Sequence, residues 1–454
     1  MKHPRFFSIL AVAFLGMTLQ GCSQNSYPTA QIKESIVKIC RDEYGIENID
    51  VKINGDTIGV YLPLTKLFAA DFREAAVTGK VRNFESLFEF SPEATEKVED
   101  VLFSISRVLL SAERPFKFYV LEATDVDKTG MQLVLTGHVD DIKRVRAWDI
   151  SRNEYRKRLI HEIRLNRAVL WHKPVREFFQ DLAVMSSSDL RMENFRMKYF
   201  GEAASDQTLK TLFWDVLSDK PEEIKKTKWE IIEIRSASMQ KNQALVYTKV
   251  RTHRGGSQEP PVDLEYIFLL SLSEEKAHIV RIIPFQYKNE TGILEHIPFP
   301  KELQIKENLE KWEEEFPVED ISMGNFLAQQ LTRRVQALLA ADERVQNTFR
   351  DVKLNFDYVK QDPAHFTLDL EVVLRDFNHY NRESLVFHED MVYLLTLASR
   401  EFVDVLRSYQ FGDYGFLTLN VAQEPSPWIL GRENLELFRR KKIDIQGLLS
   451  PVRV

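Results

Sequence analysis

Two short motifs in this chain match patterns that serve a serine nucleophile. Ser238 is followed three residues later by Lys241, and Lys128-Thr129-Gly130 matches a second element of such sites. A serine used in this way opens a buried helix, and the Lys-Thr-Gly element lies later in the chain on a strand. Here both motifs fall in predicted hairpin turns, and their order is reversed. We therefore predict no catalytic residue at either motif.

The histidines offer little for a metal site. The chain has ten, and two of them begin a pattern typical of zinc-protease helices, His161-Glu162 and His388-Glu389. In that pattern a second histidine follows four residues after the first, because both ligands must share one helix face. Leu165 and Val392 occupy those positions here. The sequence also has no phosphate-binding glycine loop or dinucleotide fingerprint, so we expect neither a metal nor a non-covalent cofactor.

The N-terminal 22 residues carry the pattern with the most specific chemistry. Lys2 and Arg5 precede an apolar segment from Ile9 to Leu15, and small residues then lead to Cys22. The motif Leu19-Gln20-Gly21-Cys22 resembles the lipobox of bacterial lipoproteins. The resemblance implies that residues 1–21 are a signal peptide and that Cys22 carries a diacylglycerol on its sulfur and an acyl chain on its amine. Two or more buried chains hold a protein stably at a bilayer, so we expect an anchored protein.

Two other interpretations of this N terminus stay open, an ordinary secretory signal and a short membrane helix. In the lipoprotein interpretation, residues 22–29 form a lipidated tether that reaches at most about 25 Å. Ser23 follows the cysteine, whereas an aspartate at that position is the familiar retention signal for the inner membrane of bacteria with two membranes. We therefore expect an exported protein, at the outer membrane and facing the periplasm if the source has two membranes.

The composition of the remaining 433 residues is typical of a globular protein with several domains. Apolar residues make up 44% of the chain, and its formal charge of −7 becomes −9 once Lys2 and Arg5 are removed. An exported acidic protein is a poor partner for nucleic acid, so we expect none. Cys22 and Cys40 are the only cysteines, and lipidation of the first leaves the second unpaired. Cys40 shares a helix face with isoleucines, which predicts a buried structural thiol.

Residues 30–145 predict an α+β domain. A helix over 30–44 stops at Gly45, and two alternating segments, 49–53 and 58–62, are joined through Asn54-Gly55-Asp56. Ser91 and Pro92 open a second helix over 92–112. Strands follow at 116–121 and 131–139. We predict the order α-β-β-α-β-β, with an antiparallel sheet and helices on one of its faces.

Residues 321–454 predict a second domain that resembles the first. The helix at 323–345, the hairpin at 352–359 and 366–374, and the helix at 385–409 repeat the same order. Five of seven positions are identical between 50–56 and 351–357. Internal duplication and coincidence both stay open. Duplication predicts that Val51 and Val352 take equivalent core-facing positions, since a shift of one residue would turn both toward solvent.

Residues 168–300 predict a third kind of module, in which helices over 172–200 and 206–217 precede a run of antiparallel strands. The strands are expected at 229–234, 243–252, 264–272 and 278–284. Their order and character resemble the cystatin-like cone of the nuclear-transport-factor-two-like superfamily, which implies a curled sheet wrapped on a helix and either a ligand pocket or a contact surface. A charged connector over 301–320 then leads to the last domain.

A basic segment separates the first and middle domains. Residues 143–167 hold nine Lys and Arg against three acidic residues, and apolar residues recur at helical spacing. We predict a basic linking helix over 146–167. Its exposed cations, Arg156, Lys157 and Arg158, are candidates for contact with anionic lipid headgroups. A solvated helix that merely links two domains is the alternative.

The function predicted from these patterns is non-catalytic. We expect an envelope lipoprotein with three α+β modules that binds or scaffolds an envelope partner or a small ligand, with the bilayer as its partner at the anchor. Two alternatives stay open. One is an envelope hydrolase whose site would show a histidine and carboxylates with shifted pKa values in one cleft. The other is a lipid or ligand carrier that uses a cavity in the middle cone.

Overall fold

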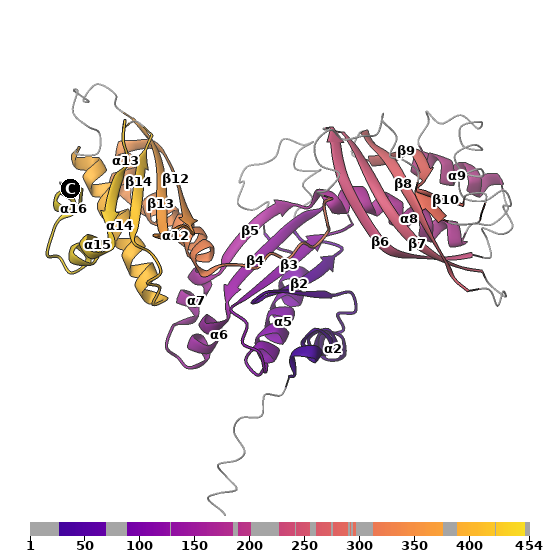
Figure 1. The fold of residues 1–454 in the computed structure, drawn as a ribbon, viewed down its shortest axis with the longest axis horizontal. Coiled ribbons are helices and arrows are strands. Elements are labelled where there is room, and N and C mark those ends of the chain that lie inside the picture. The colour runs from indigo at the N-terminus through magenta and orange to yellow at the C-terminus, as the bar shows by residue number, and fades with distance from the viewer. Residues whose placement is uncertain are drawn as a thin grey trace, which may run out of the picture.

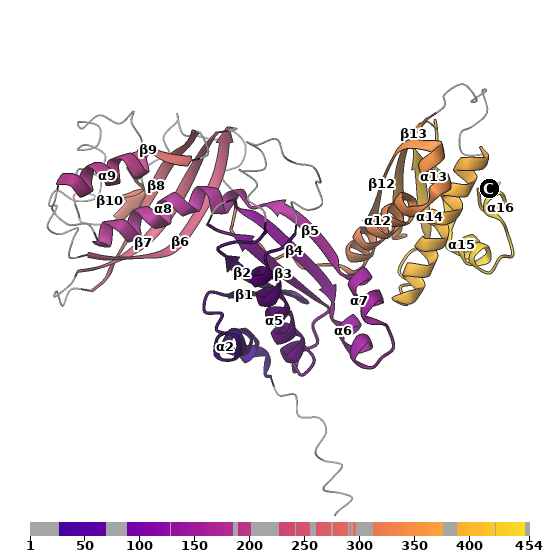
Figure 2. The ribbon, with the colours of Figure 1, turned by 180° about the vertical axis from the view of Figure 1, so that it is seen from behind.

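The computed structural model (Figures 1 and 2) is an α+β protein with several sheets, as predicted. It describes the residues 27–69, 89–127, 129–184, 189–200, 227–240, 242–254, 260–273, 276–288, 291, 294–296, 312–375, 388–422 and 424–449. The predicted signal peptide, Cys22 and most of the tether lie outside these ranges. The first domain lies between the middle and last domains (Figure 1).

The first domain is a five-stranded sheet with two long helices on one face (Figure 2). Gly45 ends α2 in the left-handed conformation, and the Ser91 side chain caps α5 by accepting from the Ala94 amide, both as predicted. The chain order is η1 (Thr29–Gln31), α2 (Ile32–Tyr44), β1 (Asp50–Asn54), β2 (Thr57–Leu64), α5 (Pro92–Leu109), β3 (Phe118–Asp125), β4 (Met131–His138), α6 (Val139–Arg146), α7 (Arg152–Arg158) and β5 (Ile160–Leu165). Cys40 is buried among the isoleucines of α2.

One strand pair differs from the predicted antiparallel sheet. The hairpin β1–β2 and the pairs β3–β4 and β4–β5 are antiparallel, but β2 and β3 are parallel. The reason is the connection through α5, because a crossover helix returns the chain to the same end of the sheet before the next strand begins.

The last domain repeats this plan. Its hairpin β12–β13 is antiparallel, β13–β14 is parallel across a crossover helix, and β14–β15 is antiparallel. The chain order is α12 (Met323–Ala341), α13 (Glu343–Thr348), β12 (Phe349–Val359), β13 (His365–Leu374), α14 (Glu389–Ser408), β14 (Phe416–Val421), β15 (Trp428–Gly431), α15 (Arg432–Arg439) and α16 (Ile445–Leu449). The shared order and pairing support an internal duplication.

The register of the repeat differs from the predicted one. The last residues of β4 and β15, His138 and Gly431, each precede the helix that follows and pair with the first residue of β3 or β14. When the two sheets are aligned on this residue pair, Val51 corresponds to Phe356, which lies four residues beyond Val352. The prediction that Val51 and Val352 are equivalent is therefore wrong. The hairpin of the last domain is longer, which moves the seven-residue match away from the structurally equivalent positions.

The middle domain is a four-stranded antiparallel meander, as predicted. Its order is α8 (Arg167–Val184), α9 (Asp189–Phe200), β6 (Thr227–Gln240), β7 (Gln243–Arg254), β8 (Val262–Ser273), β9 (Lys276–Pro284), β10 (Gln286–Lys288) and β11 (Leu294–His296). Aromatic side chains, including Phe178, Phe179 and Phe268, fill the space between α8 and the sheet. The predicted helix over 206–217 lies outside the described residues.

The predicted linking helix over 146–167 is wrong. The segment forms α7 and then β5, an edge strand of the first sheet that pairs with β4. Arg158 at the end of α7 is buried and donates to Asp141 at 2.9 Å and to Glu154 at 3.0 Å. The hydroxyl of Tyr409, in the last domain, also donates to Asp141 at 2.9 Å. Arg158 therefore helps to hold two domains together and cannot contact a membrane surface, whereas Arg156 and Lys157 are exposed.

Candidate binding site on the open face of the first sheet

The first sheet leaves one face free of its own helices, which we call the open face. Strand residues alternate between the two faces, so Tyr119 and Leu121 of β3 point to the helices while Phe118, Val120 and Glu122 point to the open face. Phe118 packs against Phe326 of α12, with ring centroids 5.1 Å apart. The last domain is therefore docked on one end of this face.

The connector to the last domain runs along the β1–β2 side of the open face. Residues 312–321, the extended orange coil in Figure 1, run over the strands near β1 and β2. Lys52 Nζ donates to the carbonyl of Phe316 at 2.8 Å, and Asn54 Nδ2 donates to the carbonyl of Val318 at 2.9 Å. These bonds satisfy backbone groups of the connector that no strand pairs.

Gly59 allows this close approach. A Cβ at Gly59 would lie 2.4 Å from Cγ2 of Val318 and 2.8 Å from Cζ of Phe316. On the same strand, the ring of Tyr61 stacks on Phe316 with centroids 5.4 Å apart. The sequence of β2 is thus shaped to receive the connector.

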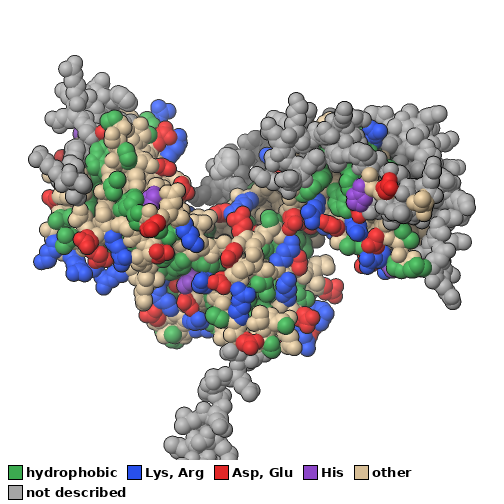
Figure 3. All heavy atoms as spheres, in the orientation of Figure 1, with side chains coloured by type: hydrophobic (Ala, Val, Ile, Leu, Met, Phe, Trp, Pro, Cys, Tyr) green, Lys and Arg blue, Asp and Glu red, His purple; other side chains and the backbone are tan. Residues whose placement is uncertain are grey.

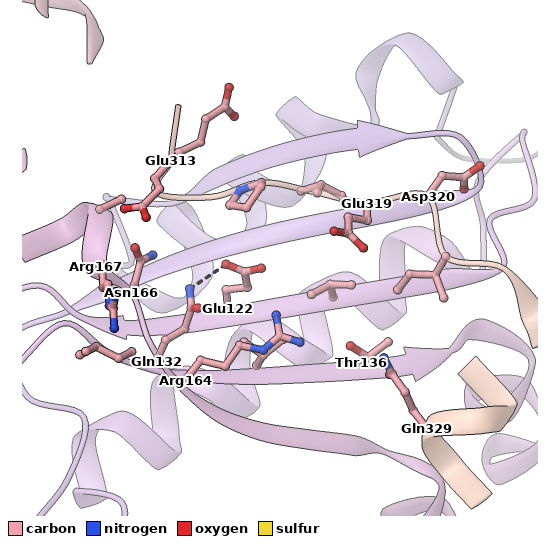
Figure 4. A pocket seen from close by; sticks show the side chains of 18 of the residues that line it. Glu122, Gln132, Thr136, Arg164, Asn166, Arg167, Glu313, Glu319, Asp320 and Gln329 are labelled. Atoms are coloured by element: carbon pink, nitrogen blue, oxygen red, sulfur yellow. Dashed lines mark hydrogen bonds between the residues drawn. The ribbon is translucent and has the colours of Figure 1, made fainter. Parts of the chain in front are cut away.

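A cavity of about 630 Å³ remains between the connector, strands β3 to β5 and the start of α12 (Figure 4). All three domains contribute to its lining. The lining includes five carboxylates and two arginines, namely Glu122, Glu313, Glu314, Glu319, Asp320, Arg164 and Arg167. The cavity therefore carries an excess of negative charge and favours a ligand with a cationic group or hydrogen-bond donors.

Glu122 lies on the floor of this cavity. Its side chain is 5% exposed, and Gln132 Nε2 donates to Glu122 Oε2 at 2.7 Å (Figure 4). Burial raises the pKa of Glu122 to about 7, although Arg164 and the Gln132 hydrogen bond act in the opposite direction. Near neutral pH this carboxyl can therefore either donate a proton to a ligand or accept a hydrogen bond from one.

A second polar group joins the connector to the middle domain. His172 of α8 is fully buried, and its Nδ1 lies 3.1 Å from Oε1 of Glu315. Arg176 donates to both oxygens of Glu315 at 3.2 and 3.1 Å. Burial alone would raise the pKa of Glu315, but the His172 and Arg176 contacts outweigh it and lower that pKa. This group fixes the connector at the edge of the cavity.

The other residues singled out from the sequence do not gather in one site. Ser238 lies near the end of β6, next to the hairpin turn, and Thr129 donates to Asp125 in the turn before β4. In the part of the chain that the structure describes, no three His, Cys, Asp or Glu side chains are placed to hold a metal ion. Sequence reasoning missed Glu122, although a single carboxylate inside the apolar run Phe118–Ala123 was a usable signal.

The surroundings of the cavity do not indicate a functional class of protein. Among the helices of the described ranges, none is both long and apolar enough to cross a membrane. Acidic and basic side chains are interspersed over the visible face of the first domain (Figure 3). The fold and site define a three-domain α+β chain with a polar cavity at the junction of its domains. No protein-family model, curated protein or solved structure matches it.

Proposed function

We propose that the chain is a lipid-anchored envelope protein that binds a partner segment or a small ligand in the open-face cavity, without catalysing a reaction. Anchoring would occur through a diacylglycerol and an acyl chain on Cys22, at the outer membrane and facing the periplasm where the source has two membranes. The observation that carries the binding proposal is the cavity itself, with buried Glu122 on its floor.

The lining supports binding at the junction for a physical reason. Because Glu122 is buried with few described hydrogen-bond partners, a ligand that donates to it would replace the water that the carboxyl lost on folding. The acidic rim from the connector adds attraction for a positive charge. Since residues from three domains meet here, a bound ligand would also strengthen the arrangement of the domains.

The two alternative functions receive less support. A hydrolase would need its histidine and its high-pKa carboxyl in one hydrogen-bonded group, but in the described residues His172 contacts Glu315 while Glu122 contacts Gln132. A carrier would need a cavity within the middle domain, and the described interior of that domain is filled by aromatic rings such as Phe178 and Phe268. Binding at the junction is therefore the function we propose.

The test is site-specific photo-crosslinking in cells that produce the full chain. A photoreactive residue replaces Asn325, an exposed position that lines the cavity. The control replaces Ile429, which is 64% exposed on β15. We expect a defined adduct from position 325 and none from position 429. Adducts of the same kind from both positions, or from neither, would contradict binding in the cavity.

A further inference from the structure

A second cavity, of about 410 Å³, lies where the first domain meets the last. Helices α7 and α12 lie side by side at this junction in both ribbon views (Figures 1 and 2). Four cationic side chains and one carboxylate line the cavity, Arg156, Lys157, Arg333, Arg334 and Glu401. Its charge is thus opposite to that of the open-face cavity.

Arg334 is the one cation of this set with carboxylate partners. It donates to Glu401 at 2.6 Å and to Glu154 at 3.2 Å, which brace α12 against α14 and α7. The positive charge of Arg334 is therefore balanced within the protein. The other three cations determine what the cavity can attract.

Arg333 is half-buried without such a balance. Its Nη1 donates to the carbonyl of Leu159 at 3.2 Å, and its Nη2 lies 2.9 Å from Nδ1 of His161. It forms no ion pair with a described carboxylate, and burial lowers its pKa although the charge of Glu162 acts in the opposite direction. A partly desolvated guanidinium without an ion-pair partner is costly, so an anion at this position would be stabilised.

Arg156 and Lys157 extend the positive surface from the first domain. Both lie in the last turn of α7, both are exposed, and neither pairs with a carboxylate in the described part of the chain. Partial burial and the charge of Arg333 lower the pKa of His161, so its ring is neutral at pH 7. Because Nδ1 faces the Arg333 donor, the proton of that ring lies on Nε2, which can also donate to an anion.

We propose that this cavity binds a phosphate ester. Arg and Lys are the side chains that bind phosphate oxygens most readily, Arg by paired hydrogen bonds and Lys as a point charge. The volume exceeds that of a bare phosphate, and Leu159, Ala337 and Leu338 supply apolar lining for the organic part. The same chemistry is present in a phospholipid headgroup and in a soluble glycerol phosphate.

The experiment measures binding to the full chain in detergent by calorimetry. The probes are glycerol 3-phosphate and dihexanoyl phosphatidylglycerol below its micelle concentration. The test variant carries Arg156→Gln and Lys157→Gln. A charge-matched control carries Lys33→Gln and Lys38→Gln, two exposed positions on α2 far from the cavity in sequence and in fold. Melting temperatures verify that each variant is folded.

We expect the parent and the control variant to bind, and the test variant to bind at least tenfold more weakly, with salt weakening all binding. Binding of the lipid alone would assign the site to a membrane headgroup. Binding of glycerol phosphate alone would assign it to a soluble ester. The proposal is overturned if neither probe binds, or if the test variant binds as tightly as the control variant.

Discussion

The change Arg158→Met should weaken the contact between the first and last domains, because it removes one half of the buried ion pair that links them. In the native chain the Arg158 guanidinium lies 2.9 Å from Asp141 and 4.7 Å from the ring centre of Tyr409, and the side chains of Arg158 and Asp141 are 4% and 2% exposed. Replacement by methionine keeps much of the volume but leaves buried Asp141 with two partners, the Tyr409 hydroxyl at 2.9 Å and the more distant Arg144 guanidinium at 3.9 Å.

Removal of one partner from a buried ion pair costs about 3–5 kcal/mol, and we expect the lower end of this range because Asp141 loses its nearest cation but keeps Arg144 at 3.9 Å. We expect the free energy of local opening of α7 and of the start of α12 to fall by this amount. A multidomain chain need not unfold in one step, so hydrogen exchange of the amides in these two helices is the appropriate assay. The soluble chain that begins at Ser23 is suitable for it.

The matched control is Arg156→Met, two residues earlier on the same helix and exposed. Its expected effect is within about 0.5 kcal/mol. In the double variant Arg158→Met with Asp141→Leu, both charges are gone, and most of the lost stability should return. If Arg158→Met and Arg156→Met have the same small effect, the buried network does not hold these domains and the reasoning fails.

Four further predictions concern the open face and the anchor. The pKa of Glu122 rises from its ordinary 4.5 to about 7 on folding, so between these pH values the folded chain holds a proton that the unfolded chain has released. The contribution of this carboxyl to the free energy of unfolding should therefore be fully present below pH 4.5 and be lost as the pH rises to about 7. Glu122→Gln, which stays neutral, should remove this decline and make the first sheet up to about 3 kcal/mol more stable than in the native chain at pH 8, as judged by hydrogen exchange of the β3 amides; parallel pH profiles of the two chains would refute it. Gly59→Ala should displace Val318 and speed hydrogen exchange of the connector at a cost of about 1–3 kcal/mol, whereas Gly431→Ala, with no atom within 4 Å of the new Cβ, should leave exchange unchanged. Cys22→Ser should abolish incorporation of labelled fatty acid, and a variant that still takes up the label would rule out lipidation at Cys22; the native chain should fractionate with outer-membrane markers if the source has two membranes.

Local signals account for what the sequence predicted well. Ser91 with Pro92, Gly45, and the turn at Gly55 each fix the backbone through nearby residues, so their elements are where we expected them. The parallel pairing of β2 and β3 depends on which strands meet across α5. That pairing is a tertiary property, and the sequence pattern of a single strand does not contain it.

The basic segment over 143–167 shows why the two cavities were harder to predict than the order of helices and strands. Tyr155, Leu159 and Ile163 recur at helical spacing, but Leu159 ends α7 and Ile160 pairs with Thr136 to begin β5. Pairing with a free sheet edge outweighed the helical pattern. The cavity above Glu122 depends on a connector about 190 residues further along the chain, and no local pattern specifies that contact.

If the open-face cavity is the binding site of this protein, a bulky side chain placed in the cavity must prevent binding. Gln329 is exposed on α12 and lines the cavity, so Gln329→Trp should fill part of it without disturbing the core. Leu437→Trp, at a position 41% exposed on α15, is the control. In cells that carry the photoreactive residue at position 325, we expect Gln329→Trp to abolish the adduct and Leu437→Trp to leave it unchanged. An adduct that survives Gln329→Trp at full yield would show that the partner or ligand does not bind in this cavity.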